Sequence, residues 1–439
     1  MTVEYLALWM FVALFALILL GFPIAFCLIS VALVFGYIRY EDIYIYQLLG
    51  RVESISTNFV LAAVPLFVFM GSILERSGIA ERLFDAFRLW TRNLPGGVAI
   101  ATILMCVMFA ASSGVVGATE AVVGLLAIPA MLKYGYDKKL ISGVICSGGS
   151  LGTIIPPSVV LIILGPMANV SIGRLFAAAM IPGLLLAGLY IAYVLLLALL
   201  RPSAVPRASE DEPQLPFKEK VIVTAKALVP PVLLVFCVLG SILFGVASPT
   251  EAAAVGGAGG LILSLIYGSI TWRALGQAIM QTLRITTMIM FILMGGMMFT
   301  SVFFSWGGMG IITSFVSALD LSPWALLIVV LLLAFLLGFF LEWISILLIF
   351  IPIFTPILAH VGFEPIWFCM LFLLIIQTSY LTPPMAPAIF YLRGISPPEM
   401  TLSHMYWGMV PFLLIQGLMI VLIMVFPQLV MWLPEVFFG

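Results

Sequence analysis

The hydrophobic positions of this chain fall in long runs separated by short polar stretches, a pattern typical of membrane-spanning helices. A span needs about 20 apolar residues, and the runs predict roughly 11 to 13 spans or half-spans once loops are allowed for. The first run, residues 5–36, has no basic beginning and no cleavage site. We therefore predict that it is a retained first span and not a signal peptide.

Three shorter stretches have a more mixed pattern. Residues 48–55 and 272–279 are too polar to span, and each is predicted to lie along the membrane interface as a separate short helix. In residues 79–90, apolar side chains recur at helical spacing opposite charged ones, which predicts an amphipathic helix. Ordinary connecting helices without a bracing role would explain these patterns equally well.

The composition places the chain in a membrane and excludes several classes of function. Hydrophobic residues make up 64% and charged residues only 8% of the 439 residues, with a net charge of −1; soluble proteins carry roughly a quarter of their residues as charges. The sequence contains no basic patch of the kind that binds nucleic acid. The five cysteines stand singly in apolar segments, which argues against disulfides and metal sites. No G-x-x-x-x-G-K phosphate loop is present, so the sequence provides no case for ATP hydrolysis.

One polar segment divides the chain into two halves. Residues 201–226 form a linker with five Lys and Arg residues, which predicts that it faces the cytoplasm. It separates a first repeat, residues 1–200, from a second repeat, residues 227–439. A shift of about 224 residues brings landmarks such as Gly21 and Gly245 into register, so we predict an internal repeat. One sequence leaves open whether the repeats are parallel or inverted, but paired breaks within the membrane favour inversion.

Each half contains a double proline inside an apolar run. Pro156-Pro157 follows Gly152 and Thr153, and Pro383-Pro384 follows Thr382. Proline lacks an N–H group and collides with the preceding turn, so no continuous helix passes through these points. Broken helices at matching places in two halves are typical of the binding site of a secondary transporter.

A second break is predicted in each half, at residues 111–120 and 337–342. Together the breaks offer free carbonyls and hydroxyl groups, which suit a weakly held alkali cation and would suit zinc badly. Half-helix N-termini that point into the same cavity would favour an anionic group on the substrate.

A few charged residues stand in apolar surroundings. Glu120 and Glu342 follow breaks and are candidates for attracting a cation. Glu251, three residues after Ser248 and close to a proline, is predicted to belong to a helix cap. Arg284 is a candidate clamp for an anionic substrate, because guanidinium binds a carboxylate through two hydrogen bonds.

These motifs resemble the large permease subunit of a tripartite ATP-independent periplasmic (TRAP) transporter over nearly the whole length. The resemblance rests on four segments, which are 112–136, 149–158, 248–256 and 381–384. It implies an all-α integral membrane protein with two repeats, broken helices and re-entrant hairpins, which works by an elevator motion. The chain departs from the family in having Glu342 where Asp is frequent, and Met385-Ala386-Pro387 where a glycine commonly follows the double proline.

The resemblance also implies a function and partners. The expected activity is Na⁺-coupled, ATP-independent uptake of a small organic anion, a carboxylate or 2-oxo acid, across the bacterial inner membrane. The expected partners are the lipid bilayer, a small membrane subunit of about four helices, and a periplasmic protein that binds the substrate. By motif position, the sodium ligands would be Ser112, Gly114, Gly152, Ile155 and Pro157 in one half, and Gly338, Thr382 and Met385 in the other. Neighbouring positions are the candidate substrate-binding residues, namely Ser113, Thr153, Ser158, Pro383 and Pro384.

Other functions remain as alternatives. A stand-alone sodium/anion symporter of related architecture would need no binding protein. A membrane enzyme would need clustered His or acidic residues near an interface, and the sequence has none. A purely structural membrane protein would be destabilised by repeated helix breaks without benefit.

Overall fold

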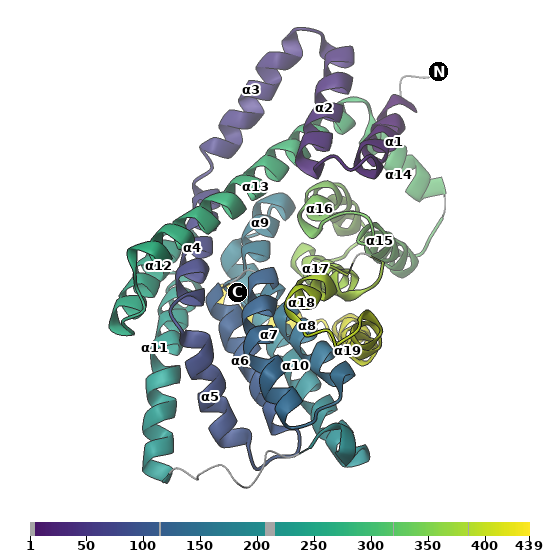
Figure 1. Cartoon of the computed structure of the whole chain (residues 1–439). Helices are drawn as coiled ribbons and strands as arrows, with labels where there is room; N and C mark the ends of the chain where they lie inside the picture. The colour runs from purple at the N-terminus through teal and green to yellow at the C-terminus, as the bar shows by residue number, and fades with distance from the viewer. Residues whose placement is uncertain (1–4, 114–115, 207–215, 319, 385) are drawn as a thin grey trace.

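The computed structural model describes residues 5–113, 116–206, 216–318, 320–384 and 386–439. Within these ranges all regular structure is helical (Figure 1). The α-helices of the first half are α1 Tyr5–Leu19, α2 Ile24–Tyr40, α3 Ile43–Ser56, α4 Ala63–Glu75, α5 Ile79–Thr91, α6 Gly97–Ser113, α7 Val116–Lys133, α8 Lys138–Ser150, α9 Val159–Ala168 and α10 Ile172–Leu200. Those that follow are α11 Phe217–Leu243, α12 Pro249–Ile266, α13 Trp272–Ser305, α14 Gly308–Ala318, α15 Pro323–Leu337, α16 Trp343–His360, α17 Pro365–Leu381, α18 Pro387–Ile395, α19 Leu402–Val425 and α20 Gln428–Phe438. Three short 3₁₀ turns are η1 Phe59–Ala62, η2 Leu151–Thr153 and η3 Pro202–Ala204.

Six of the described helices are long and apolar enough to cross a membrane, and a seventh crossing is possible if α3 and the segment Phe59–Glu75, bent by 52°, form one span. The remaining apolar helices are shorter. The opening run is not one span as predicted, because the chain turns between α1 and α2. Gly21 has φ +88° there and Pro23 precedes the second helix, so the backbone cannot continue as a single helix.

The prediction of separate interfacial helices is wrong for residues 272–279, which form the beginning of α13, a continuous helix of 34 residues. No proline interrupts this stretch, so the polar residues at its start simply extend an apolar helix. Residues 79–90 fall in α5 as predicted: Leu83 and Phe84 are buried and Glu81 is exposed.

A layer of long helices, here called the scaffold layer, consists of α2, α4, α11, α12 and α13 (Figure 1). The long α13 crosses the layer diagonally and contacts both α2 and α4. Helix α4 lies directly on α12, which is rich in glycine. A Cβ atom added at Gly260 would meet the backbone oxygen of Met70 at 3.6 Å, so the two backbones approach closely there. Small residues at such a crossing let membrane helices gain van der Waals contact.

The start of α12 carries the predicted cap. The Ser248 side chain accepts a hydrogen bond from the Glu251 backbone N–H, and a Glu251 carboxylate oxygen accepts one from the Ser248 backbone N–H at 2.8 Å. This reciprocal arrangement satisfies two N–H groups that would otherwise lack partners at the helix start. The prediction for Glu251 is thus confirmed.

We expect the Ser248→Ala substitution to lower the free energy of unfolding by about 1 kcal/mol, because the side-chain acceptor of the cap is lost. Thermal unfolding of the purified protein checks this. Ser403→Ala, at an exposed position whose hydroxyl makes no hydrogen bond among the described residues, serves as the control. Equal midpoints for Ser248→Ala and the unchanged protein would contradict the capping role.

The second part of the fold is a bundle formed by α6–α10 and α15–α19, here called the core bundle. Helices α6 to α9 and α15 to α18 follow each other in the same order and with similar lengths in the two halves. Helices α8 and α19 cross in close contact, because a Cβ atom added at Gly408 would overlap with the Lys139 carbonyl oxygen. The core bundle therefore packs the two halves of the chain against each other.

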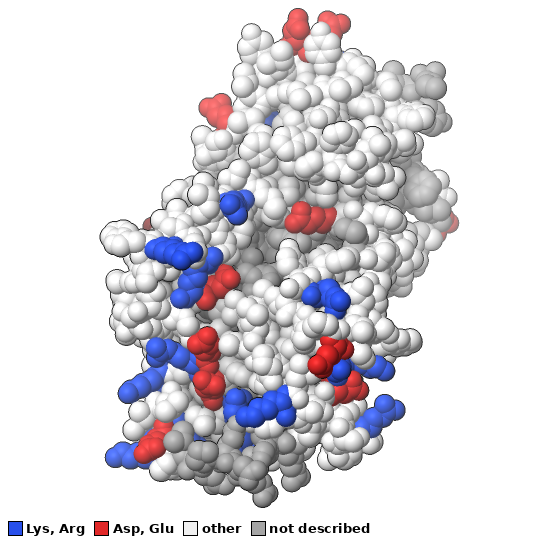
Figure 2. Space-filling view, in the orientation of Figure 1, with Lys and Arg blue, Asp and Glu red and all other residues white. Residues whose placement is uncertain are grey.

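Charged side chains are unevenly distributed over the surface. On the face shown in Figure 2, Lys and Arg gather over the lower half, where α5 and the start of α11 lie in Figure 1. The upper end, with α2 and α3, displays mainly acidic residues on this face. Apart from a few charged side chains near its middle, most of the rest of this face is uncharged, as expected for a protein that presents apolar side chains to lipid.

Candidate functional site

The first double proline lies in a fully buried break between α8 and α9. Helix α8 ends at Ser150, and α9 begins at Val159 after η2. Two hydroxyls hold the break together: Thr153 Oγ1 donates to the Ser150 carbonyl at 2.8 Å, and Ser158 Oγ donates to the Thr153 carbonyl at 2.8 Å. Gly152 and both prolines are buried as well.

The second double proline lies in a break between α17 and α18. Helix α17 ends at Leu381, and Thr382 Oγ1 donates to the Thr378 carbonyl at 2.7 Å. Here Pro383 and Pro384 are exposed, unlike their counterparts in the first half. Both Pro-Pro peptide bonds are cis. The two breaks thus share a construction but differ in their access to the surroundings.

A cavity of about 520 Å³ lies between the scaffold layer and the core bundle. The scaffold layer contributes Ile24 of α2 and four residues of α13 to its wall, and the core bundle contributes residues of α9, α16, α17 and α18 and of the loop before α16. The polar and aromatic lining residues are Gln281, Phe340, Glu342, Trp343, Ser379, Tyr380 and Tyr391. This is the size and mixed lining of a small-molecule site.

Three helices begin at this cavity. Residues of the first turns of α9, α16 and α18 line it, among them Val159, Trp343 and Pro387. None of these three N-termini has a side-chain cap, whereas α12, α13, α15 and α19 are capped by Ser or Thr. Uncapped N-termini leave backbone N–H groups and the positive ends of helix dipoles available to an anionic group.

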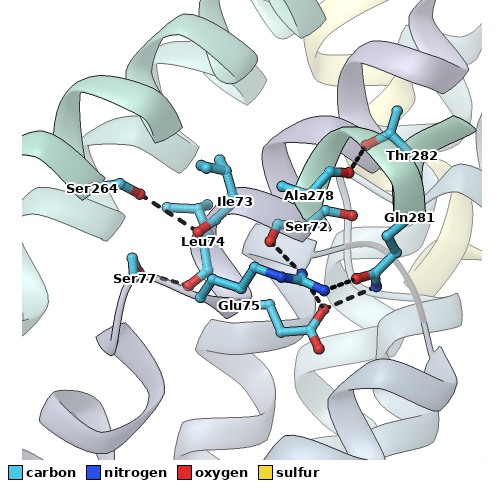
Figure 3. Close-up of polar contacts among 10 residues, drawn as sticks. Ser72, Ile73, Leu74, Glu75, Ser77, Ser264, Ala278, Gln281 and Thr282 are labelled. Carbon is cyan, nitrogen blue, oxygen red and sulfur yellow. Dashed lines mark hydrogen bonds and ion pairs between the residues drawn. The ribbon is translucent and has the colours of Figure 1, made fainter. Parts of the chain in front are cut away.

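On the scaffold side, Gln281 is held in place by two charged residues at the end of α4 (Figure 3). Arg76 Nη2 donates to Gln281 Oε1 at 2.5 Å, and Gln281 Nε2 donates to Glu75 Oε2 at 3.1 Å. Arg76 Nη1 also donates to the Ser72 carbonyl at 2.9 Å. These hydrogen bonds fix the amide at the cavity wall in one orientation. The opposite charges of Glu75 and Arg76 behind it largely cancel each other.

On the bundle side, Glu342 stands at the start of α16 and lines the cavity. Within the described part of the chain its carboxylate makes no hydrogen bond or ion pair. The described lining residues include no Lys, Arg or His. The carboxylate therefore faces the cavity without a protein cation beside it.

Several predicted sodium ligands have free carbonyl oxygens. Among the hydrogen bonds of the described residues, none ends on the carbonyl oxygens of Ile155, Pro157 or Gly338. Gly338 itself lines the cavity, and its Cα lies so close to Ser379 that an added Cβ would overlap with Ser379 Oγ. Carbonyl oxygens left free where helices break are typical Na⁺ ligands in transporters, so these residues fit the ion.

Buried hydrogen bonds link the two halves behind the cavity. Tyr380, which lines the cavity, donates its hydroxyl to Glu120 Oε2 at 3.2 Å. Glu120 is fully buried, and its other oxygen has no hydrogen-bond partner among the described residues. Gln377 Nε2 donates to Ser150 Oγ at 2.9 Å, and these two residues are separated in sequence by the same interval as the double prolines.

Other predicted site residues lie away from the cavity or outside the described ranges. Gly114 and Met385 lie outside the described residues, as do the side chains of Ser112 and Ser113. Arg284 is exposed on α13 and is not among the residues that line the cavity, although its neighbour Ile285 is. Thr382, Pro383 and Pro384 also do not line it, although Tyr380 and Pro387 on either side do.

Several residues of the cavity wall were not predicted from the sequence. Gln281, Tyr380 and Tyr391 belong to this group. A glutamine on an apolar helix is a signal that could have been used for Gln281. The aromatic residues carry no comparable signal, because the chain contains 33 phenylalanines and 13 tyrosines.

Comparison with known proteins agrees with this arrangement. The sequence model of the family described as "Tripartite ATP-independent periplasmic transporter, DctM component" matches residues 11–429. The C4-dicarboxylate TRAP transporter large permease DctM of Pseudomonas aeruginosa is 31% identical over 382 residues, which cover 87% of each chain. The sialic acid large permease SiaM of Vibrio cholerae is 30% identical over 96% of this chain and 97% of that protein. The ectoine/5-hydroxyectoine large permease UehC of Ruegeria pomeroyi is 30% identical over 98% of this chain and 99% of that protein.

Among solved structures, the YdaH transporter of Alcanivorax borkumensis has a similar fold, with a TM-score of 0.64 and 17% identity. The match covers 98% of this chain and 100% of that chain. The family match over nearly the whole length makes the protein a transport permease and not an enzyme. With its spanning helices, its interrupted helices and this match, the chain belongs to the TRAP transporter large permease (DctM) family, the multi-pass membrane subunit of these ATP-independent bacterial transporters.

Proposed function

We propose that this permease carries out Na⁺-coupled uptake of a small organic acid across the bacterial inner membrane. The observation that carries this proposal is the cavity between the scaffold layer and the core bundle, where three uncapped helix N-termini meet. A carboxylate on the substrate would accept hydrogen bonds from these N–H groups and interact favourably with the helix dipoles. Relatives whose names give C4-dicarboxylates, sialic acid and ectoine as substrates support an organic acid.

Sodium is the proposed coupling ion. The free carbonyls of Ile155, Pro157 and Gly338 support this role, and Gly152 and Thr382 lie in the two double-proline breaks. By the family motif, Ser112, Gly114 and Met385 would complete the two sets of ligands. Binding of Na⁺ would satisfy free carbonyl dipoles and order the breaks that border the substrate, which couples the two binding events.

Movement of the core bundle against the scaffold layer is the proposed transport step. The cavity has one wall from each part, so a rigid-body shift of either would open or close it. The exposed second break and the buried first break support a state that is open to one side only. In this proposal residues 1–200 and 227–439 are inverted repeats, and the linker 201–226, on the side rich in Lys and Arg, is cytoplasmic.

The proposed transporter has two protein partners, a periplasmic protein that delivers the substrate and a small membrane subunit of about four helices. The family to which the chain belongs is tripartite, which supports both. The alternative is a stand-alone sodium/anion symporter, whose uptake would be the same without the binding protein. Uptake measured with and without the receptor separates the two, since a TRAP permease should lose transport when the receptor is left out.

We expect uptake of the receptor-bound substrate into proteoliposomes to fall at least tenfold when external Na⁺ is replaced by K⁺ at equal ionic strength. The reason is that K⁺ is larger than Na⁺ and fits the carbonyl sites poorly, and that without external Na⁺ there is no inward Na⁺ gradient to drive uptake.

Substituting leucine for Gly152 or Thr382 should reduce uptake while the protein still accumulates in the membrane. Unchanged uptake in K⁺ would rule out sodium coupling, and full activity of both variants would rule out the assigned ligands.

A further inference from the structure

A second cavity, here called the α11 groove, has a volume of about 330 Å³. Helix α11 of the scaffold layer forms one wall, and α6 and α10 of the core bundle, the first double-proline break and α20 form the rest. The described lining residues include none with a polar side chain. Ile155 and Pro156 of the break line this groove, whereas Val159, just after the break, lines the large cavity. The first break therefore lies between the two cavities.

The groove opens to the lipid. Helices α10 and α11 are both long and apolar enough to cross the membrane. Leu184 of α10 and Phe236 of α11 line the groove and are themselves exposed. The medium around these two spans is hydrocarbon, so the groove is filled from the bilayer and not from water.

The length of the groove corresponds to one leaflet. Its lining residues on α11 recur at helical spacing from Val232 to Phe244, a distance of about 18 Å along the helix. The hydrocarbon core of a bilayer is about 30 Å thick, so the chains of one leaflet extend over about 15 Å. Since these residues form the second half of α11, the groove lies in the leaflet away from the linker 201–226.

The volume of the groove fits a single chain and not a helix of another subunit. An α-helix with its side chains is about 10–12 Å across, so about 18 Å of helix fills more than about 1,000 Å³. The groove has about a third of that volume. Left empty, its apolar walls would lose dispersion contacts. A single hydrocarbon chain provides those contacts without bringing a polar group into the groove.

Gly240 keeps this space open. Glycine is unfavourable in the interior of a helix, so its presence in α11 calls for a reason. Close helix packing is the reason at Gly256 of α12, where an added Cβ atom would lie 2.7 Å from the Met70 sulfur. At Gly240 an added Cβ atom would meet only ring carbons of Phe236, at 3.8–3.9 Å. The missing side chain at Gly240 thus leaves room in the groove and does not serve a contact between helices.

We infer that an acyl chain of a membrane phospholipid occupies the α11 groove and packs against Ile155 and Pro156 of the first break. The inference depends neither on the transported substrate nor on the coupling ion. The bound chain lies between α11 of the scaffold layer and α6 and α10 of the core bundle. A lipid is therefore part of the contact between the two parts of the protein.

Photolabelling in a bilayer tests this inference on the purified permease with its small subunit. The bilayer consists of phosphatidylethanolamine and phosphatidylglycerol, with a trace of phosphatidylethanolamine that carries a diazirine in the middle of one acyl chain. Peptide mass spectrometry then locates the labelled residues. We expect labels on Leu239 and Ile155, which line the groove and are only 6% and 5% exposed, as well as on lipid-facing residues such as Leu332 of α15.

A variant that fills the groove locates the effect. Gly240→Leu should reduce labelling of Leu239 and Ile155 at least fivefold and leave labelling of Leu332 unchanged. Gly188→Leu is the matched control: Gly188 is exposed on α10, does not line the groove, and an added Cβ atom there would have no neighbour within 4 Å. After delipidation, added phosphatidylethanolamine should raise the unfolding temperature of the unchanged protein and of Gly188→Leu more than that of Gly240→Leu.

Three results would overturn the inference. The first is labelling of Leu332 without labelling of Leu239 and Ile155 in the unchanged protein, which decides the matter even if Gly240→Leu does not fold. The second is equal labelling of the groove in Gly240→Leu and Gly188→Leu. The third is labelling of the groove only when the small subunit is absent, which would mean that a helix of that subunit covers it.

Discussion

Replacing Gly408 by leucine is expected to prevent assembly of the folded permease. Helices α8 and α19 cross here with their backbones in contact. A Cβ atom at Gly408 would overlap with the Lys139 carbonyl oxygen, and it would lie 2.9 Å from the Lys139 carbonyl carbon and 3.2 Å from the Gly143 amide nitrogen. These are backbone atoms, so no rotamer change relieves the clash, and the helices have to separate. Overpacking of a core by side chains alone costs about 1–3 kcal/mol, so we expect a loss greater than about 3 kcal/mol for this variant.

The measurement is the yield of monodisperse protein from detergent extracts, followed by thermal unfolding of whatever can be purified. Gly417→Leu is the matched control. It lies on the same helix, but a Cβ atom there would have no neighbour within 4 Å, so the substitution should be tolerated. Normal yield and stability of Gly408→Leu would mean that α8 and α19 do not cross at this point, which would contradict the packing of the core bundle.

Replacing Tyr380 by phenylalanine is expected to destabilise the protein by up to about 3 kcal/mol, since the carboxyl group of Glu120 would lose its hydrogen bond while remaining fully buried. The ring is retained, so packing changes little. Tyr391→Phe is the control, because Tyr391 is half-exposed and its hydroxyl makes no hydrogen bond among the described residues, so its removal leaves no buried partner unpaired. Thermal or denaturant unfolding of the two variants gives the comparison.

Adding Glu120→Met to Tyr380→Phe should restore part of the lost stability. Methionine is unbranched like glutamate and fits the tight space beside Gly149, where an added Cβ atom would overlap with Glu120 Cγ. The double variant buries no unpaired carboxyl group, and removing both partners of a buried hydrogen bond costs less than removing one. If Glu120→Met destabilised the Tyr380→Phe protein by as much as it destabilises the unchanged protein, the two side chains would act independently, and the hydrogen bond between them would not contribute to stability.

The sequence determined the features that depend on composition or on a few neighbouring residues. The hydrophobic runs predicted a helical membrane protein, the prolines predicted interruptions after α8 and α17, and Ser248 with Glu251 predicted a capped helix start. Each of these rests on physics that acts within one helical turn or on the average polarity of a segment. The motifs indicated the family for the same reason, since each is a short run of neighbouring residues.

Local rules failed where neighbouring segments had to be combined. The opening run became two helices because of the turn at Gly21, and residues 272–279 joined α13 instead of forming a separate helix. Hydropathy averaged over a window records neither a single left-handed glycine nor the continuation of a helix through a polar first turn.

Only the tertiary structure decided how distant segments meet. The Glu120–Tyr380 hydrogen bond joins residues 260 positions apart, and the Arg76–Gln281 hydrogen bond joins residues 205 apart. The tertiary structure also decided that three uncapped N-termini converge at one cavity, that the carboxylate of Glu342 stays free, and that the two double prolines differ in exposure. A helix turns by about 100° per residue, so a shift of one position decides whether a side chain faces lipid, a neighbouring helix or the cavity. That rotation is fixed by packing against partners hundreds of residues away, which local sequence patterns do not encode.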